Sequence, residues 1–586
     1  MTQKIDLPAG RQEKLRHSLS HLMTMAILEI YPKAGLGVGP TIENGFYQDY
    51  DTPKPITEDM LPKIEEKMRE LIKQDIKFEQ HDATFAKALA FYKKDKYKTE
   101  LIKDLKKKGE KNVSFYKSGD FDNLCAGPHV KSTKEINPNA FKITKIAAAY
   151  WRGDEKNKML TRVYGVAFET EKELMDYLKM QEEAEKRDHR KLGEKLKLFT
   201  ISDLIGAGLP LMQPKGMIVR KEIEDYLWDL HKNKGYSRVW TPHIAKKDLY
   251  ETSGHAAKFG NELFKVKGGD EEFFLKPMNC PHHMQIFADN QFSYRDMPVR
   301  YFEPATVYRY EKTGELSGLT RVRSVTQDDG HLFCRESQIT EEVSTIVGII
   351  RDFYATMNML EGYWVRLSVR GKDKKMYIGK DESWKRAEEA LEKSARENNL
   401  NYKRIEGEAA FYGPKLDFMF KDAIGREWQL ATIQCDFNLP ERFDLNFINE
   451  NGEKERPVVI HRAISGSLER FMGVMIEHYA GAFPVWLSPV QAAIIPISEK
   501  QKDYAEKIAS QLKEQSVRVE IKADNETLGK RIREAEMEKI PYLLVVGDKE
   551  IAANAVSIRQ RGKGDLGQMQ INAFTDKIKE EIKSKK

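Results

Sequence analysis

The feature that most constrains the fold of this sequence is a charge-rich stretch at residues 171–197, which separates blocks of different character. Within it Leu174, Leu178 and Met180 recur at helical spacing, and charged side chains fill most other positions. This pattern is typical of an exposed helix that joins domains. A chain of 586 residues is also too long for a single core. We therefore expect an N-terminal domain, a linker helix, a central domain and a C-terminal domain at 1–170, 171–197, 198–487 and 488–586.

The hydrophobic patterns of these blocks predict a multidomain α+β protein. Residues 1–170 mix helical and strand signals, from an amphipathic stretch near 17–30 to a strand-like run at 161–168. The central block has short aromatic-rich strands between long helices, which is typical of an antiparallel sheet covered by helices. The last block alternates strand-like runs, such as PYLLVV, with helical stretches at 500–515 and 527–538. That alternation indicates a small α/β domain with a partly parallel sheet.

Charge and cysteine content narrow the class of protein. There are 97 Lys and Arg against 91 Asp and Glu, a formal net charge of +6, which permits a basic groove for nucleic acid but excludes a strongly basic coat. The four cysteines are too scattered for a disulfide framework. We find neither a signal peptide nor an apolar run of about 18 residues, so we expect a soluble, cytoplasmic protein without a membrane contact.

One group of histidines and a cysteine in the first block is a candidate site. His17 and His21 are four residues apart in a helical stretch, so both rings project from one face. Cys125 and His129 form a C-x-x-x-H pair far downstream. The residue types fit a tetrahedral zinc site, a hydrolytic pocket in which a thiol and imidazoles activate water, or two unrelated helical histidines and a buried cysteine. Spacing alone leaves all three interpretations open.

Arginines in the central block are candidates for binding phosphate. Two strand-like runs joined by the loop EKTGELSGLT predict a hairpin, with Arg309 and Arg321 on its facing strands. A third arginine, Arg470, lies at a helix start. Paired guanidinium groups on a rigid sheet suit a triphosphate, because arginine binds phosphate oxygens bidentately. The sequence has no G-x-x-x-x-G-K-[ST] phosphate loop.

Several segments together resemble the threonyl-tRNA synthetases, a family of class II aminoacyl-tRNA synthetases. PKGMIVRKEIEDYL with GYSRVWTPHI is similar to the dimer-forming motif 1, RYFEPATVYRYEKTGELSGLTRVRSVTQDDGHLF to motif 2, and GSLERFMG to motif 3. KPMNCP, QDDGH and VIHRAISGS resemble the signatures specific to the threonine enzyme. HSLSHLM with LCAGPHV is similar to the editing domain, and VRVEIKADNETLGKRIREAE with PYLLVVGDKE to the anticodon-binding domain. The resemblance covers nearly the whole chain.

The resemblance implies a fold and an activity. The fold is a class II catalytic domain with an antiparallel sheet and helices, an N-terminal α+β editing domain and a C-terminal α/β anticodon-binding domain, without the further N-terminal domain of TGS type. The activity is threonine–tRNA ligation, in which threonine and ATP give threonyl-adenylate and the threonyl group passes to tRNA(Thr). Mischarged seryl-tRNA(Thr) is hydrolysed at a separate site. The implied partners are tRNA(Thr), ATP, L-threonine and a second copy of the chain in a homodimer.

The resemblance also implies a zinc site in the catalytic domain, with Cys280, His331 and His461 as ligands. No local spacing ties these three residues together. In the family one Zn²⁺ per subunit takes the amino and hydroxyl groups of threonine, and Mg²⁺ accompanies ATP. Valine lacks the hydroxyl group and is rejected, whereas serine lacks only a methyl group, worth about 1–3 kcal/mol in a pocket. A second, hydrolytic site is therefore needed to remove serine.

The resemblance implies further roles for the residues of this chain that match functional positions of the family. Arg309 would face the α-phosphate, Gln327 the reacting carboxylate, and His255 would be the general base for transfer to tRNA. The far end of ATP is assigned to Arg321 and Arg470. Substrate binding is assigned to Asp329, Tyr412, Gln429 and Gln434. Editing is assigned to His17, His21, Cys125 and His129, in a pocket that is not known for a metal in bacterial members. Reading of the anticodon is assigned to Asn525, Arg533 and Arg559.

The chain departs from the family pattern at several positions. Asn123 stands where the editing signature has an acid, and Ala126 where it has an arginine; an amide cannot act as a base, which bears on the strength of editing. His282 replaces a glycine next to the first zinc ligand, and Leu430-Ala431 replace Cys-Gly. Two alternatives are another class II enzyme, such as the prolyl enzyme, and an RNA-binding paralogue that has lost catalysis. The zinc signatures oppose the first, and the arginines of motifs 2 and 3 oppose the second.

Overall fold

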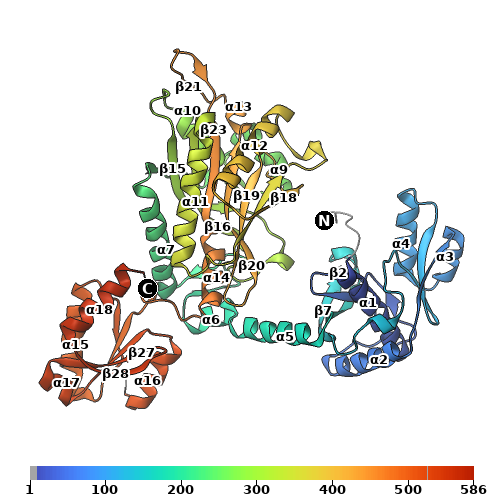
Figure 1. Ribbon diagram of the computed structural model, residues 1–586, viewed down its shortest axis with the longest axis horizontal. Coiled ribbons are helices and arrows are strands. Elements are labelled where there is room, and N and C mark those ends of the chain that lie inside the picture. The colour runs from blue at the N-terminus through green and yellow to red at the C-terminus, as the bar shows by residue number, and fades with distance from the viewer. Residues whose placement is uncertain (1–9, 524, 586) are drawn as a thin grey trace. The chain divides into compact units, whose positions relative to one another are not determined.

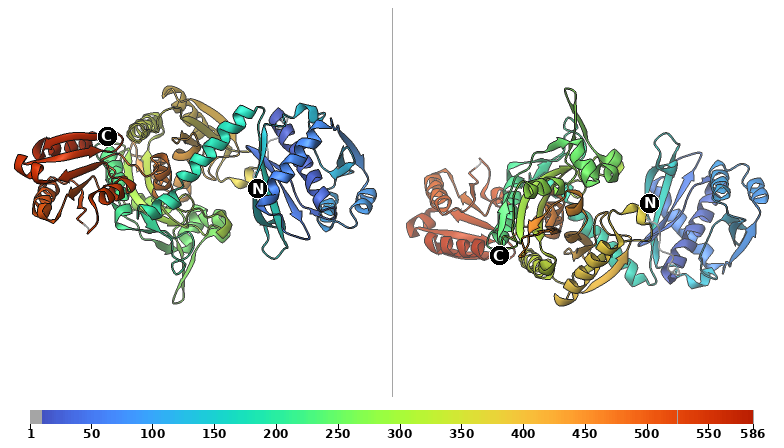
Figure 2. Two further views of the ribbon diagram at one scale, coloured as in Figure 1. Left: turned by 90° about the horizontal axis from the view of Figure 1, so that it is seen from below. Right: turned by 90° about the horizontal axis from the view of Figure 1, so that it is seen from above.

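The computed structural model of the protein describes residues 10–523 and 525–585 (Figures 1 and 2). The chain divides into two compact units, Met1–Glu182 and Glu183–Lys586. Within the described ranges, no helix combines the length and the apolar character that crossing a membrane would need.

The first unit is an antiparallel sheet with helix α1 packed on it. The sheet has the order β1-β3-β8-β7, with β2 beside β3. The bounds of these strands are Gly35–Leu36, Thr41–Ile42, Gly45–Asp51, Phe141–Tyr150 and Met159–Ala167 for β1, β2, β3, β7 and β8. Helix α1, Arg11–Ile30, buries Leu19, Leu22 and Ile27 in the same core as Phe46 of β3 and Ile64 of α2, Leu61–Lys73. This core fixes the helix that carries His17 and His21.

A smaller sheet in the same unit presents the second half of the histidine–cysteine group. Strands β4, β5 and β6 are Phe78–Ala83, Val113–Ser118 and Phe121–Leu124, and they pair antiparallel in that order. Cys125 is the first residue after β6, and its N–H still donates to the carbonyl of Ser114 at 3.0 Å. Helices α3, Phe85–Phe91, and α4, Lys96–Lys107, lie between β4 and β5 in the chain.

The second unit is built on an eight-stranded sheet of order β11-β15-β16-β23-β20-β19-β17-β18. Only its two edge pairs, β11 with β15 and β17 with β18, are parallel. In that order the strands are Tyr236–Arg238, Val299–Tyr308, Ser324–Cys334, Val458–Ser467, Glu427–Asp436, Lys415–Lys421, Trp364–Val369 and Tyr402–Glu406. The antiparallel sheet predicted for the central block is confirmed.

Helices cover one face of this sheet, and the alternation along each strand leaves the other face for polar groups. Helix α11, Ile339–Thr356, contacts β20 and β23, and α14, Leu468–His478, contacts β16 and β23. Leu332 and Ile460 join the core formed with these helices. Because successive side chains of a strand point to opposite faces, His331 and His461 point away from that core.

The last part of the second unit is the α/β domain with a partly parallel sheet that its sequence predicts. Strands β25, β24 and β26 (Val519–Ile521, Ala492–Pro496 and Tyr542–Val546) are parallel, and β26, β27 and β28 (the last two Ala555–Gln560 and Gly564–Gln570) are antiparallel. Helices α15, Lys502–Glu514, and α16, Leu528–Met537, fall on the predicted helical stretches. Strand β28 and helix α18, Ile571–Lys583, were not predicted.

The single helix predicted at 171–197 is broken in the structure. Helix α5 is Glu171–Lys186 and α6 is His189–Lys195. The break has a local cause: Asp188 takes a non-helical backbone conformation, with φ −48° and ψ 117°, and its carboxylate accepts the N–H of Arg190 at 2.8 Å. Aspartate is a favoured N-cap residue, so the second helix starts afresh at His189.

Candidate functional site

Cys280, His331 and His461 meet in the second unit although they are far apart in the sequence. Cys280 begins helix α10, Cys280–Ala288, and the two histidines face each other across the β16–β23 pair. All three side chains are buried, and their ligand atoms lie within 4.8 Å of one another. Strand register therefore assembles this group, which is why no spacing in the sequence reveals it.

The hydrogen bonds of the two histidines leave one nitrogen of each ring available to a metal ion. His461 donates from Nε2 to Oδ2 of Asp436 at 2.9 Å, which leaves the Nδ1 lone pair. Nδ1 of His331 lies 2.8 Å from Nδ1 of His283. The two remaining atoms, Nδ1 of His461 and Nε2 of His331, are buried and have no hydrogen-bond partner among the described residues. Burial also lowers the pKa of His331 well below its usual range, so its ring is neutral, as a ligand must be.

A chain of buried polar groups fixes the orientation of His331. His283 donates from Nε2 to Oε2 of Glu303 at 3.0 Å, so its Nδ1 carries the lone pair that accepts the N–H of His331. Glu303 in turn accepts the N–H of Thr241 at 2.9 Å and lies 3.7 Å from Nζ of Lys276. Such outer partners set the tautomer of a ligating histidine and strengthen metal binding. A group of one cysteine and two histidines suits Zn²⁺ with coordination positions left open.

Side chains that could bind a small polar substrate surround this group. The ring of Tyr412 stacks on His461 at 4.7 Å between centroids, and its hydroxyl donates to Oε1 of Gln434. Asp329, on the same strand as His331, accepts from Nδ2 of Asn279 at 3.1 Å. Gln429, unlike Gln434, forms its hydrogen bonds with charged side chains. Its amide oxygen accepts from Arg366 at 2.8 Å, and its amide nitrogen donates to Asp417 at 2.9 Å.

His255 lies near the same substrate residues. Its ring centroid is 6.3 Å from that of Tyr412. Ser253 donates its hydroxyl to the carbonyl of Tyr250 at 3.2 Å, so its oxygen accepts the Nδ1–H of His255 at 2.8 Å. Burial lowers the pKa of His255 to about 3, and its Nε2 is buried without a hydrogen bond to any residue of the described ranges. The ring is therefore neutral, and the lone pair is on Nε2.

The predicted pairing of Arg309 with Arg321 on facing strands is wrong. Strand β15 ends at Tyr308 and β16 begins at Ser324, so the residue opposite Arg309 is Arg323, whose carbonyl accepts the N–H of Arg309 at 3.0 Å. Arg321 lies before β16 in the connecting loop, because Ser317 and Arg321 exchange backbone hydrogen bonds and close a turn.

Three polar side chains nevertheless remain candidates for a phosphate site. The Arg470 side chain is half-buried, and its pKa is lowered by burial and by the positive charge of Arg321. Two arginine side chains whose charges influence each other in this way suit a polyanion. Gln327, on β16, has a buried Oε1 without a hydrogen-bond partner in the described chain.

The second candidate site is in the first unit, where the structure brings His17, His21, Cys125 and His129 together. Their potential ligand atoms lie within 4.8 Å of one another. Sγ of Cys125 is 3.3 Å from Nε2 of His17 and 3.3 Å from Nε2 of His129. The ring of His129 lies 4.3 Å from each of the other two histidine rings, between centroids. The interpretation of two unrelated helical histidines and a buried cysteine is therefore wrong.

Hydrogen bonds assign the tautomer of His129. Ser18 donates its hydroxyl to the carbonyl of Lys14 at 2.9 Å, so its oxygen accepts the Nδ1–H of His129 at 3.1 Å. Nε2 of His129 then carries a lone pair facing Cys125. Burial lowers the pKa of His129 to about 2, so this ring is neutral at physiological pH. The pocket can therefore polarise water or a substrate hydroxyl without a charged imidazole.

Asn123, which replaces the expected acid, is part of a directed hydrogen-bond chain. The N–H of Leu124 donates to the hydroxyl oxygen of Tyr92 at 2.8 Å, and that hydroxyl donates to Oδ1 of Asn123 at 3.1 Å. Nδ2 of Asn123 is consequently the group that faces Nε2 of His21, at 3.5 Å. The neighbouring acid, Asp122, does not replace it, because it pairs with His81 at 3.0 Å.

Lys98 is a functional candidate that the sequence analysis missed. It is buried in helix α4, and its charge interacts with both Cys125 and His21. The available signal was its spacing, since Lys98 and the buried Ile102 are four residues apart and share one face of α4. A lysine in the apolar stripe of a short helix is unusual, because burying an ammonium group is costly.

The residues predicted to read an anticodon lie on the C-terminal α/β domain. Asn525 and Arg533 are exposed, and Arg533 belongs to α16. Arg559, on β27, is half-buried, with its guanidinium 3.9 Å from Glu536. All three side chains remain available to a ligand, but within the described residues no hydrogen bond or ion pair joins them in one cluster.

Known protein families match three segments of the chain. Residues 264–479 match the tRNA synthetase class II core domain (G, H, P, S and T), 491–581 match the anticodon binding domain, and 113–164 match the threonyl and alanyl tRNA synthetase second additional domain. These matches agree with the mixed fold classes predicted for the three domains.

Similar proteins cover almost the whole chain. It is 50% identical over 582 residues to the threonine–tRNA ligase of Thermus thermophilus, covering 96% of this chain and 88% of that protein. It is 48% identical over 584 residues to the threonine–tRNA ligase of a Sulfurihydrogenibium species, covering 98% and 89%. A solved structure of the RNA binding domain of threonyl-tRNA synthetase from Cryptosporidium parvum superposes with a TM-score of 0.64 at 35% identity, over 67% of this chain and 98% of that chain.

The burial of Lys98 predicts a stability effect that depends on pH. Burial lowers its pKa from 10.5 to about 8, so between these values the unfolded chain binds more protons than the folded one and stability rises with pH; below about 8 the full penalty is present. We expect Lys98→Met to raise the melting temperature of the first unit by a few degrees at pH 7 and by less at pH 10. Calorimetry of the full chain would measure this, with the exposed Lys94→Met as the control. A gain that is absent at pH 7, or larger at pH 10, would contradict the assignment.

Proposed function

Because this chain belongs to the threonine–tRNA ligase family, we propose that it activates threonine with ATP, transfers the threonyl group to tRNA(Thr) and hydrolyses mischarged seryl-tRNA(Thr). The observation that supports this most directly is the presence of two separate buried sites in one chain. The Cys280, His331 and His461 group lies in the second unit among substrate-binding side chains, and the histidine–cysteine pocket lies in the first. An enzyme that cannot fully reject serine when it is activated needs a second site of this kind.

Selection of threonine is assigned to the first group and its surroundings. Zn²⁺ held by Cys280, His331 and His461 would coordinate the amino and hydroxyl groups of threonine. Asp329 would bind the amino group, and Tyr412 with Gln434 would close over the amino acid. An apolar pocket alone separates such isosteres as threonine and valine by only about 10²-fold. Coordination of the hydroxyl group by Zn²⁺ would add to this discrimination, because threonine has that group and valine does not.

Activation is an in-line displacement at the α-phosphorus of ATP. A carboxylate oxygen of threonine forms the new bond and pyrophosphate leaves, with Mg²⁺ on the phosphates. Arg309 would stabilise charge on the α-phosphate, and Gln327 would orient the reacting carboxylate with its amide. Arg321 and Arg470 would hold the β- and γ-phosphates. The contribution of these side chains is positioning and charge stabilisation.

Transfer to tRNA is assigned to His255. A ribose hydroxyl of the terminal adenosine attacks the carbonyl carbon of the adenylate, AMP leaves, and the hydroxyl proton must be accepted. The lone pair on Nε2 of His255 and its neutral ring suit this role. The base at the anticodon end of the same tRNA would be read by Asn525, Arg533 and Arg559, through hydrogen bonds and stacking to unpaired nucleotides.

Hydrolysis of seryl-tRNA is assigned to His17, His21, Cys125 and His129, with Lys98 binding an anionic or ester oxygen. Asn123 offers His21 an N–H rather than a carboxylate. His21 would therefore act as a hydrogen-bond donor to the substrate, and the lone pair on Nε2 of His129 would accept a proton through Cys125 or water. This arrangement works without a metal ion.

A cytoplasmic homodimer is the proposed working form. In the second unit, apolar side chains are unusually exposed between residues 201 and 244: Leu204 is 98% exposed and Trp240 is 74% exposed. Others in this stretch are Ile201, Ile205, Leu211, Met217 and Ile244. An exposed apolar patch of this kind marks an interaction surface. It includes the segments that resemble motif 1.

Amino-acid-dependent ATP–pyrophosphate exchange tests the proposed activity. We expect exchange with threonine, weak exchange with serine and none with valine, and we expect a chelator to abolish all of it. The absence of threonine-dependent exchange in zinc-replete protein would contradict the ligase assignment and favour an RNA-binding paralogue that has lost catalysis. Exchange that depends on proline would favour the other class II enzyme.

Zinc affinity tests the role of the polar chain behind His331. His283→Ala removes the acceptor of the His331 N–H, and loss of such a partner typically weakens metal binding about 10–100-fold. Competition with a chromophoric chelator would measure the affinity. His282→Ala is the matched control, because both ring nitrogens of His282 lack hydrogen-bond partners among the residues described. Equal effects of the two substitutions would refute the assignment.

Self-association tests the exposed patch. Trp240→Glu places a charge in the proposed interface, and loss of a buried aromatic anchor there costs about 2–4 kcal/mol. We expect light scattering to show a dimer for the unmodified chain and a shift towards monomer for the variant. Met376→Glu is the control, since Met376 is 56% exposed and lies outside the patch. Dissociation by both variants, or by neither, would contradict the prediction.

A further inference from the structure

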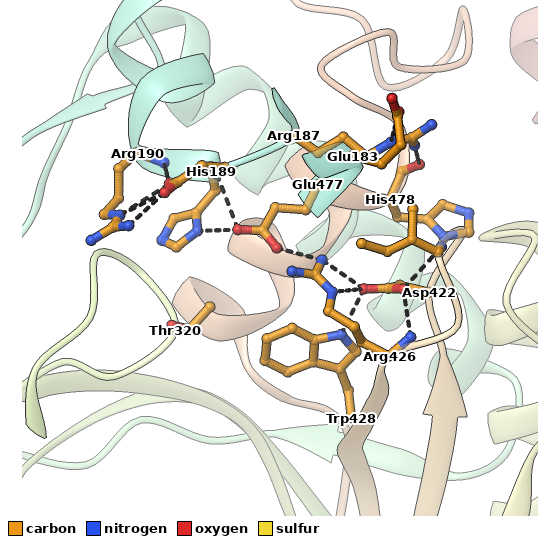
Figure 3. A network of polar contacts seen from close by, with 12 residues as sticks. Glu183, Arg187, His189, Arg190, Thr320, Asp422, Arg426, Trp428, Glu477 and His478 are labelled. Atoms are coloured by element: carbon orange, nitrogen blue, oxygen red, sulfur yellow. Dashed lines mark hydrogen bonds and ion pairs between the residues drawn. The ribbon is translucent and has the colours of Figure 1, made fainter. Parts of the chain in front are cut away.

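A buried histidine outside both sites connects the start of helix α6 to the ATP-binding loop (Figure 3). The side chain of His189 is 4% exposed. Its Nδ1 lies 2.6 Å from Oε1 of Glu477, and its Nε2 accepts the backbone N–H of Leu319 at 3.0 Å. Accepting from Leu319 requires a lone pair on Nε2, so the proton is on Nδ1 and is donated to Glu477.

The segment held by His189 is the turn that precedes Arg321. Ser317 donates its N–H to the carbonyl of Arg321 at 3.1 Å, and Arg321 donates back at 3.2 Å. Gly318 within this turn has φ +47°, and a Cβ there would lie 2.1 Å from Nε2 of His189. The ring therefore occupies the space that only a glycine leaves open, and the shape of the turn depends on it.

The other partner of His189 belongs to the helix that carries Arg470. Glu477 and Arg470 are seven residues apart in α14, so they lie on the same side of it, two turns apart. Glu477 also accepts the backbone N–H of His189 at 3.1 Å and pairs with Arg426 at 2.5 Å. The carboxylate is thus held from two sides.

Arg426 extends the contacts to the phosphate site. It pairs with Asp422 at 2.7 Å, and Asp422 accepts the indole N–H of Trp428 at 3.0 Å. The guanidinium of Arg470 lies over the Trp428 ring, 5.8 Å from its centroid. Figure 3 shows Glu477, Arg426, Asp422 and Trp428 in this order.

From these contacts we propose that His189 is a positioning residue for ATP, which fixes the Ser317–Arg321 turn against α14 and so sets the distance between Arg321 and Arg470. The proposal rests on the proposed function of the two arginines. Arg321 needs such support, because its side chain is 50% exposed and its ion pairs, with Glu311 and Glu315, are within its own loop. Exposed pairs of this kind position a side chain weakly.

Two substitutions separate the two hydrogen bonds of His189. The amide of His189→Asn replaces the Nδ1–H donor to Glu477 but offers nothing at the Nε2 position, whereas His189→Gln places an oxygen near Nε2 and can accept the N–H of Leu319. Loss of one such hydrogen bond corresponds to about a threefold to tenfold effect. We expect His189→Asn to raise the KM for ATP by about that factor in pyrophosphate exchange. We expect the KM for threonine and kcat to stay near their original values, and His189→Gln to keep the original KM for ATP.

A matched control and a binding measurement make the outcome decisive. His231→Asn is the control, since His231 is equally buried and donates from Nδ1 to the carbonyl of Leu227, away from the loop. A lower melting temperature in both Asn variants, with the KM for ATP raised only in His189→Asn, would support the proposal. An unchanged KM for ATP, or a parallel loss for ATP and threonine, would overturn it. Calorimetric titration with ATP gives the same comparison without turnover, so an absence of threonine-dependent exchange in the unmodified chain would contradict the proposed function separately.

Discussion

The pairing of β16 with β23 is the constraint on which the catalytic unit depends. The two strands change register between Gln327 and Asp329, and the carboxylate of Asp328 fills the irregularity. It accepts the backbone N–H groups of Ile464 at 2.7 Å and of Ser465 and Gly466 at 3.0 Å each. With that register set, His331 stands opposite His461, and Asp329 is brought to the same face. A buried carboxylate satisfied by backbone donors thus determines where the metal-binding and substrate-binding side chains lie.

The two histidine–cysteine groups show how neighbours, rather than residue types, decide chemistry. In the second unit, Asp436 and His283 take one nitrogen of each ring, and the remaining lone pairs converge beside Cys280. In the first unit, Cys125 lies within hydrogen-bonding distance of two imidazoles, and Asn123 offers an N–H to a third. The first arrangement favours holding a metal ion, and the second favours moving protons. The composition of either group would not distinguish them.

Much of the fold could be predicted from the sequence because the signals are local. Short apolar runs between helical stretches marked strands of the C-terminal domain, and the i, i+4 spacing placed His17 and His21 on one helix face. Two expectations failed for local reasons that the hydrophobic pattern did not reveal. Asp188 interrupts the linker helix by capping α6, and the loop between β15 and β16 is long enough to keep Arg321 out of the sheet. The zinc-type group needed either strand register or a family resemblance, since 51 and 130 residues separate its members (331 − 280 and 461 − 331). The burial of Lys98 could have been predicted from the sequence, because Lys98 shares the apolar face of α4 with Ile102.

The register between β16 and its neighbours also limits how this part of the chain can change over evolutionary time. Because side chains alternate along a strand, inserting or deleting one residue between Asp328 and Cys334 would turn Leu332 or Gly330 towards the ligands and His331 towards the core. Point substitutions of core residues can be absorbed by repacking, but a change of length here cannot. Variation in length should therefore collect in the turns, such as the exposed one at 449–453 that joins the short strands Phe447–Ile448 and Lys454–Glu455. The strands that form the site would tolerate substitutions but not insertions or deletions.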